Sequence, residues 1–180
     1  MQTSIHRKGN KVKLIASSLL MVLATQVSSF ANAQAPRPQV PLTRLESLGQ
    51  QLFTDRNLSQ PTGTACVSCH TANTGFANNH GSRIGVALGS TPTSLGLRNS
   101  MSNAYNGFVP SFTFTNTAGK IKAVGGHFWD GRANTLALQA LAPFLAATEM
   151  NNPNAAAVVR KVAAAPYANL MRAEFGNTIF

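Results

Sequence analysis

Ala65-Cys66-Val67-Ser68-Cys69-His70 contains the only two cysteines of this 180-residue chain, and a histidine follows them directly. C-x-x-C-H is the attachment signature of a c-type haem. The spacing suits that chemistry, because two thiols on one turn can add to the two vinyl groups and the next imidazole can then ligate the iron. We therefore predict one covalently bound haem c, attached to Cys66 and Cys69, with His70 as the iron ligand.

Two other uses of a C-x-x-C pair fit this chain less well. A four-ligand zinc site would need a second Cys or His pair, which the sequence does not supply. A thioredoxin-like redox pair would lie in a strand-rich βαβ pattern, and no such pattern surrounds the motif.

The N-terminal segment predicts export. Residues 1–33 contain basic positions 7, 8, 11 and 13, an apolar run over 14–27, and the cleavage site Ala31-Asn32-Ala33. This is the pattern of a secretory signal peptide, and the apolar run is short for a membrane anchor. We expect a periplasmic chain that begins near Gln34 and has no membrane span after cleavage. Covalent haem attachment of this kind also takes place outside the cytoplasm, so leader and motif agree.

The charge balance favours acidic partners over nucleic acid. The net charge of +10 falls to +6 once the four basic residues of the leader are removed. The remaining basic residues are scattered and not interleaved with aromatic ones, which disfavours nucleic-acid binding. A modest positive balance suits the steering of acidic electron donors, although an ordinary solvated surface also produces it.

Apolar periodicity predicts a mainly α, cytochrome c-like haem domain with long irregular loops over residues 42–180, after an extended lead-in at 34–41. Thr43-Arg44-Leu45-Glu46 has the form of a capping box and predicts a helix over 42–53. Three more helices are expected: from about 135 to Pro143, from an Asn152-Pro153 cap to 164, and from Pro166 to a stop at Gly176. In the last of these, Tyr167, Leu170, Met171 and Phe175 share one face.

Residues 71–126 lack any long periodic apolar run and are rich in Gly, Asn, Ser and Thr. Phe112-Thr113-Phe114 alternates and predicts a short strand. Such a long irregular stretch is unusual in a compact domain. A buried haem explains it, because loops can pack against the porphyrin.

Taken together, these residues resemble the N-terminal haem domain of the bacterial di-haem cytochrome c peroxidase family, which includes the MauG-type enzymes. The resemblance covers nearly all of residues 42–180 in the right order. Its motifs are Leu48-Gly49-Gln50-Gln51-Leu52-Phe53-Thr54-Asp55, Leu58-Ser59, Cys66 to His70, Gly75-Phe76, Arg98-Asn99, Phe128-Trp129-Asp130-Gly131-Arg132-Ala133, Gln139-Ala140, Pro143 and Glu149-Met150.

The resemblance implies a peroxidatic haem, with His70 on the proximal side and the opposite face open to hydrogen peroxide. It places Glu149, Gln139 and Pro143 on that distal side. Heterolytic cleavage of the O–O bond needs a group that takes the proton of bound peroxide and returns it to the departing oxygen. Glu149 is the candidate, and its apolar neighbours are expected to raise its pKa. Without the resemblance, Glu149 would pass as an ordinary helix-end carboxylate and Gln139 as a surface residue.

Three further residues acquire roles only through the resemblance. Trp129, the single tryptophan, resembles the aromatic group between the two haems of the family and would carry electrons, whereas core packing is the default for a lone tryptophan. Asn99 resembles a calcium ligand, whereas by itself it is a turn residue. Asp130 is expected to pair with Arg132 within its turn.

The chain departs from the family pattern in two places. Val86 stands where many members carry a histidine that blocks the resting iron, which implies a five-coordinate or water-bound iron. His80 and His127 are expected to be solvated or loop residues. The family also has a second haem domain with its own C-x-x-C-H, which would begin where this chain stops.

The expected partners are therefore hydrogen peroxide, a small redox protein donor (a cytochrome c or a cupredoxin), and a second haem domain or subunit. Two alternatives to a peroxidase remain open. One is a single-haem electron carrier in which Met101, Met150 or Met171 is the second iron ligand. The other is a non-catalytic fragment of a di-haem peroxidase.

Overall fold

The computed structural model describes residues 40–180, so the expected signal peptide and most of the lead-in lie outside the described residues. The order of elements is α2 (Arg44–Thr54), η1 (Arg56–Leu58), α3 (Cys66–Cys69), η2 (Ala72–Thr74), η3 (Asn106–Phe108), β1 (Thr113–Thr117), β2 (Lys120–Val124), α4 (Leu136–Leu145), α5 (Ala155–Ala163) and α6 (Ala168–Phe175). The prediction of a mainly helical domain is confirmed for this part of the chain. No helix within it is long and apolar enough to cross a membrane.

The first described helix, α2, begins with the predicted capping box. The Thr43 hydroxyl accepts a hydrogen bond from the Glu46 N–H at 3.2 Å, and the Glu46 carboxylate accepts one from the Thr43 N–H at 2.8 Å. These bonds satisfy two amide donors that the helix itself leaves unpaired, and they lower the pKa of Glu46. The helix then continues to Thr54, one residue beyond the predicted end.

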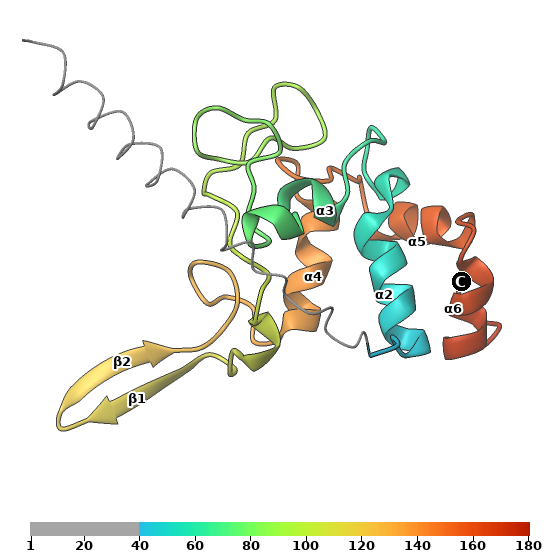
Figure 1. Ribbon diagram of the computed structural model, residues 1–180. Helices are drawn as coiled ribbons and strands as arrows, with labels where there is room; N and C mark the ends of the chain where they lie inside the picture. Colours follow the sequence, from blue (N-terminus) through green and yellow to red (C-terminus); the bar gives the residue numbers. More distant parts are fainter. Residues whose placement is uncertain (1–39) are drawn as a thin grey trace, which may run out of the picture. The chain divides into compact units, whose positions relative to one another are not determined.

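The hydrophobic core lies among the helices that flank α2. It is formed by five buried side chains, Leu48, Leu58, Met150, Val162 and Tyr167. α2 contacts α6, and α5 contacts η1, so the core joins both ends of the described chain. Figure 1 shows α2 between α4 on one side and the pair α5 and α6 on the other. The Tyr167 hydroxyl donates to the Asp55 carboxylate at 2.7 Å, which fixes the start of α6 against the end of α2.

The predicted start of α5 is wrong by two residues. Asn154, not Asn152, is the N-cap, and its side-chain oxygen accepts from the Ala157 N–H at 2.9 Å. Asn152 is instead buried, and its amide nitrogen donates to the carbonyls of Leu58 and Phe144 at 2.7 and 2.8 Å. Both asparagines suit a cap by type, and tertiary contacts decide between them.

The other helix predictions are confirmed in part. Thr135 caps α4, but Pro143 lies inside this helix, which continues to Leu145. Gly176 follows the last residue of α6 as expected. On the predicted apolar face of that helix, Tyr167 is buried and Met171 packs against the core, whereas Leu170 and Phe175 are exposed.

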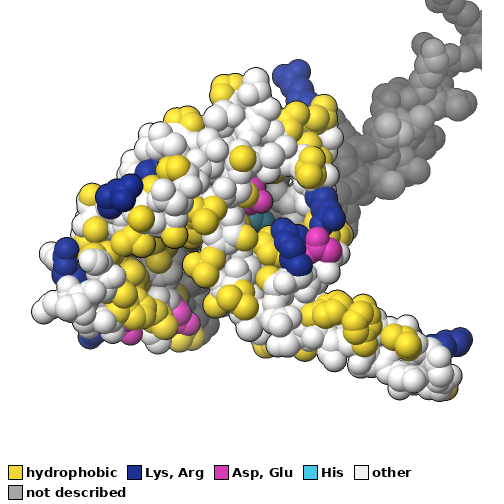
Figure 2. All heavy atoms as spheres, turned by 180° about the vertical axis from the view of Figure 1, so that it is seen from behind, with side chains coloured by type: hydrophobic (Ala, Val, Ile, Leu, Met, Phe, Trp, Pro, Cys, Tyr) yellow, Lys and Arg dark blue, Asp and Glu magenta, His cyan; other side chains and the backbone are white. Residues whose placement is uncertain are grey.

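The predicted short strand is one arm of a hairpin. β1 pairs with β2 in antiparallel register, with Asn116 opposite Ile121, and all ten strand residues are exposed. The second strand, Lys120-Ile121-Lys122-Ala123-Val124, begins with an alternation of polar and apolar residues, a strand signal that the prediction did not use. Figure 1 shows the hairpin extending away from the helices, and Figure 2 shows apolar side chains along it.

Residues 71–105 contain only one short 3-10 turn, which confirms their irregular character.

Candidate functional site

The cysteine pair lies on α3, a single helical turn that is anchored by its neighbours. The Ser68 hydroxyl accepts from the Ala65 N–H at 3.1 Å, and Arg56 donates to the same hydroxyl and to the Gly63 carbonyl. The His70 N–H closes the turn on the Cys66 carbonyl at 3.0 Å. Both thiols and the imidazole are therefore held on a turn whose position is fixed by hydrogen bonds.

The orientation of His70 is set by a backbone carbonyl. Its Nδ1 lies 2.9 Å from the Phe76 oxygen. Because a carbonyl only accepts hydrogen bonds, Nδ1 carries the proton, and the lone pair of Nε2 is left to bind a metal. Phe76 has a φ of 59°, in the left-handed region that a bulky residue rarely adopts. The sequence pattern gave no sign of this carbonyl partner.

Two cavities of about 490 and 320 Å³ lie beside the cysteine turn. Seven residues line both of them, namely Cys69, His70, Asn103, Asn106, Gln139, Pro143 and Glu149. Figure 2 shows a hollow in which acidic and histidine side chains are visible, with basic side chains at its edge. The haem motif and all three predicted distal residues, far apart in the sequence, thus share one site.

Glu149 lies in the turn after α4, between α4 and α5. The opening of the cavity leaves the residue accessible to solvent, yet the surrounding protein desolvates its carboxyl group. This desolvation raises the pKa of Glu149, and the positive charge of Arg132 opposes the effect. The expected direction of the shift is confirmed, whereas the catalytic roles of Glu149 and Gln139 stay predictions.

The two cysteines are free thiols that are partly buried. Burial raises the pKa of Cys66, and it raises the pKa of Cys69 to about 11, with the nearby Glu149 carboxylate adding to both shifts. Two thiols, an imidazole with a free Nε2 and a largely apolar cavity together fit a c-type haem. Cys66, Cys69 and His70 would hold that haem, and Pro143 would contact it from α4.

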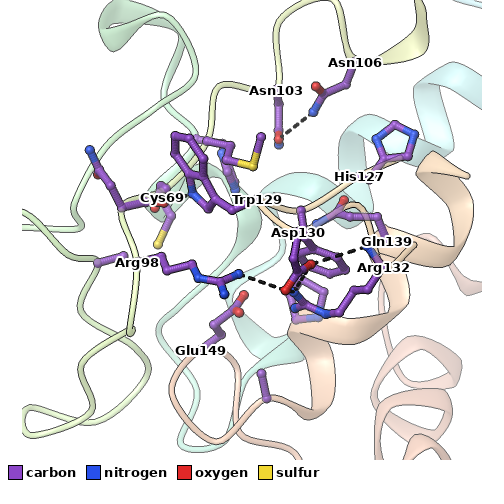
Figure 3. A pocket seen from close by; sticks show the side chains of 18 of the residues that line it. Cys69, Arg98, Asn103, Asn106, His127, Trp129, Asp130, Arg132, Gln139 and Glu149 are labelled. Atoms are coloured by element: carbon purple, nitrogen blue, oxygen red, sulfur yellow. Dashed lines mark hydrogen bonds and ion pairs between the residues drawn. The ribbon is translucent and has the colours of Figure 1, made fainter. Parts of the chain in front are cut away.

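The predicted pairing of Asp130 with Arg132 is confirmed and extends to a third residue. The Asp130 carboxylate accepts from Arg132 at 2.8 Å and from Arg98 at 2.9 Å. These two bonds lower the pKa of Asp130 to about 2. The Arg132 guanidinium also stacks on the Phe128 ring at 3.6 Å from its centre. Figure 3 shows this cluster at one side of the cavity that Glu149 also lines.

Trp129 is not a core residue, since 60% of its surface is exposed. Its indole N–H donates to the Asn99 carbonyl at 2.9 Å, so both residues lie at the edge of the larger cavity. Residues 40–180 hold no group of three or more His, Cys, Asp or Glu side chains that could bind a metal. The calcium role of Asn99 stays a prediction.

The two remaining histidines differ from each other. His80 lies in a loop, where its Nδ1 bonds the Leu88 carbonyl at 2.7 Å, as expected for a loop residue. His127 lies between β2 and α4, is only 6% exposed and lines the larger cavity, so of the two expected alternatives it is a loop residue and not a solvated one. A two-way backbone bridge with Ala133 holds it there. Val86 does not line either cavity, although its neighbour Ala87 does.

Comparisons with known proteins agree with this geometry. The family model for di-haem cytochrome c peroxidases matches residues 43–180. The chain belongs to this family. Among curated members, the methylamine utilization protein MauG of Paracoccus denitrificans is 34% identical over 92% of the chain, and that of Methylorubrum extorquens is 30% identical over 79%.

Solved di-haem peroxidase structures share the fold. The diheme peroxidase BthA of Burkholderia thailandensis superposes with a TM-score of 0.68 at 37% identity, and one of its variants with 0.70 at 35%. Each covers 76% of this chain. The chain spans 42% and 35% of the two MauG proteins and about a third of the BthA chains.

Two cavity residues of this family member were not anticipated. Asn103 and Asn106 line both cavities, and the Asn106 amide donates to the Asn103 side chain at 3.3 Å. The recurrence of asparagine at 99, 103 and 106 in a long loop was the available signal.

Proposed function

We propose that this chain is a periplasmic c-type haem peroxidase domain that reduces hydrogen peroxide to water. A small redox protein, a cytochrome c or a cupredoxin, delivers the electrons, and a second haem domain or subunit passes them on. Family membership supports a peroxidase-like role. One observation carries the proposal: the carboxyl of Glu149, the amide of Gln139 and the imidazole of His70 line the same cavity.

The cofactor supplies an iron that binds peroxide and exchanges electrons. The protein supplies the orientation of the imidazole, because the Phe76 carbonyl fixes the Nδ1 proton of His70 and directs Nε2 to the metal. A histidine whose Nδ1–H is bonded is a stronger electron donor through Nε2. This arrangement supports reduction of a bound ligand.

The proton chemistry falls to Glu149. Reduction of one peroxide to two waters consumes two protons and two electrons, and the first proton transfer is internal to the peroxide. A carboxylate oxygen of Glu149 would take the proton from one peroxide oxygen and return it to the other. Desolvation brings its pKa closer to neutral pH, which suits a group that must both accept and release a proton.

Electron entry is assigned to Trp129. Its exposed indole stands at the cavity edge, and the bond to the Asn99 carbonyl restrains the ring. An electron partner that docks over this indole would approach the cofactor without displacing any residue of the core.

Replacement of Glu149 by glutamine tests the proposal, with Glu174→Gln as the matched control. Glu174 lies on α6 and pairs only with Arg44 at the surface. In the haem-loaded chain mixed rapidly with hydrogen peroxide, Glu149→Gln is expected to slow the optical change about 100-fold or more. Glu174→Gln is expected to leave it unchanged. Equal rates for Glu149→Gln and the wild type would refute the assigned chemistry.

An electron carrier is the second candidate, and Met101 is the observation that favours it, because this residue lines the larger cavity. Met171 packs against the core and lines neither cavity, whereas Met150 belongs to the core and also lines the smaller cavity, so Met150 stays a second candidate ligand. A low-spin His/Met absorption spectrum that disappears in Met101→Ala would favour the carrier. A high-spin spectrum that is unchanged in Met101→Ala favours the peroxidase.

A further inference from the structure

The Glu149 carboxylate makes no hydrogen bond to any residue in the described part of the chain, so its place in the cavity depends on its backbone. A proton-transfer group must be held to within a fraction of an ångström of its reactive position. The elements that fix the backbone around Glu149 therefore determine how well it works. Some of these elements are local, since the Glu149 N–H donates to the Ala146 carbonyl at 2.9 Å, and others lie in a loop more than fifty residues earlier in the sequence.

Three residues of that loop each contact one of the three residues 147, 148 and 149. The Ser94 hydroxyl donates to the Ala147 carbonyl at 2.8 Å. The Ser90 N–H donates to the Glu149 carbonyl at 2.8 Å. Between them, Gly89 lies directly against the peptide group of Thr148.

The contact at Gly89 leaves no room for a side chain. A Cβ atom at this position would overlap the Thr148 carbonyl oxygen, and it would lie 2.7 Å from the Thr148 carbonyl carbon and 2.8 Å from the Ser94 hydroxyl. Two of these three atoms belong to the backbone and cannot turn away. Gly89 is therefore required for close approach, not for an unusual backbone angle.

The loop is itself rigid and is tied to a second anchor. Its ends are closed by the Gly89 N–H to Ser94 carbonyl bond at 2.8 Å and by the bridge between Leu88 and Leu95. The Ser90 hydroxyl donates to the Gln60 carbonyl at 2.9 Å, and the Gln60 N–H donates to the Met150 carbonyl at 2.7 Å. Every residue from 147 to 150 is thus held from outside its own segment.

We infer that the loop from Gly89 to Ser94 is a positioning element for Glu149, which fixes the backbone of residues 147–149 and thereby the place of the carboxyl in the cavity. This inference rests on the proposed function, because it concerns the same proton-transfer group. It assigns Gly89, Ser90 and Ser94 as positioning residues. Gly89 also lines the smaller cavity, whereas Ser94 lines neither cavity, so Ser94→Ala is the variant that acts on Glu149 only through the backbone.

Two substitutions test the inference in the haem-loaded chain. Gly89→Ala pushes on the Thr148 peptide, and Ser94→Ala removes the bond to Ala147. The matched controls are Gly49→Ala, where a Cβ meets nothing within 4 Å, and Ser82→Ala, whose hydroxyl only accepts from the Ile84 N–H in its own turn. The rate of the peroxide reaction is measured from acid to alkaline pH. Hydrogen exchange at the Ser90 amide is measured in parallel.

Both test variants are expected to slow the peroxide reaction about tenfold or more and to shift the midpoint of its pH profile. The Ser90 amide is expected to exchange faster, and both controls are expected to match the wild type. If Gly89→Ala does not accept haem, Ser94→Ala decides the question. Faster exchange with wild-type rates and pH midpoints would make the loop merely structural and would overturn the inference.

The inference and the proposed function fail in different ways. Wild-type reactivity of Glu149→Gln would refute the proton-transfer role, and the positioning of Glu149 would lose its purpose with it. A slow Glu149→Gln protein, together with wild-type behaviour in Gly89→Ala and Ser94→Ala, would refute only the positioning role.

Discussion

Replacement of Asn152 by serine is expected to destabilise the fold. Asn152 is 4% exposed, and its amide nitrogen donates to the carbonyls of Leu58 and Phe144. A serine hydroxyl is too short to replace both bonds. The Phe144 carbonyl would keep the bond from the Asn152 backbone N–H, but the buried Leu58 carbonyl would be left unpaired. An unpaired buried acceptor and one lost bond together cost about 2–3 kcal/mol, and removal of the Asn152 side-chain oxygen, which is buried without a partner among the described residues, offsets about 1 kcal/mol of this cost. The net loss is therefore about 1–2 kcal/mol.

The same replacement at Asn154 provides the control. Serine is as good an N-cap as asparagine, so Asn154→Ser should stay within about 0.5 kcal/mol of the wild type, whereas Asn154→Ala should lose about 1 kcal/mol. The free energy of unfolding is measured by urea titration of the haem-loaded chain, and the slope of the transition checks that the unfolded state is unchanged. If Asn152→Ser were as stable as the wild type, the buried bonds would have no energetic importance, and the reasoning would be refuted.

Three further predictions concern ionisation. Because its pKa is raised in the folded state, Glu149 destabilises the haem-free fold as pH rises through that pKa. The haem-free Glu149→Gln variant should therefore be more stable than the wild type at pH 7. Chemical unfolding at a series of pH values should show this difference in stability vanish below the ordinary pKa of 4.5. Asp130 affects stability in the opposite direction, since its pKa is lowered from 3.8 to about 2 in the folded state. The stability that its ionised form contributes is complete above pH 4 and is lost as pH falls towards 2. Asp130→Asn should therefore flatten the dependence of unfolding on pH in that range. In the haem-free chain, where Cys69 is a free thiol, iodoacetamide should alkylate it much more slowly than an ordinary thiol at pH 8, with a rate that rises towards pH 11. A rate that levels off near pH 9 would contradict the assigned pKa shift.

Local signals were sufficient where the chemistry is local. The capping box at Thr43 and the C-x-x-C-H turn depend on residues within a few positions of each other, and both have the expected form. The resemblance to di-haem peroxidases then named Glu149, Gln139 and Pro143 as neighbours of His70. Spacing alone could not do so, because more than sixty residues separate them from the motif.

Predictions failed where tertiary contacts choose between residues of similar type. Asn152 and Asn154 are equally good caps, and only the burial of Asn152 between two carbonyls decides which one caps α5. The default core position does not hold for Trp129, which is exposed at the cavity edge, and the electron-carrying role that the resemblance implies stays a prediction. The role of the loop at Gly89 was not predicted, because it depends on a close contact between Gly89 and the Thr148 backbone that has no room for a side chain. Such a contact between distant residues cannot be read from composition.

The separation between core and cavity bears on how the chain matures. No member of the core cluster, and none of the apolar side chains packed against it, comes from residues 71–126. Met150, 3% exposed, belongs to the core and also lines the smaller cavity, next to Glu149. Attachment of the cofactor at Cys66 and Cys69 and packing of the helical core therefore depend on different sets of residues, and Met150 belongs to both.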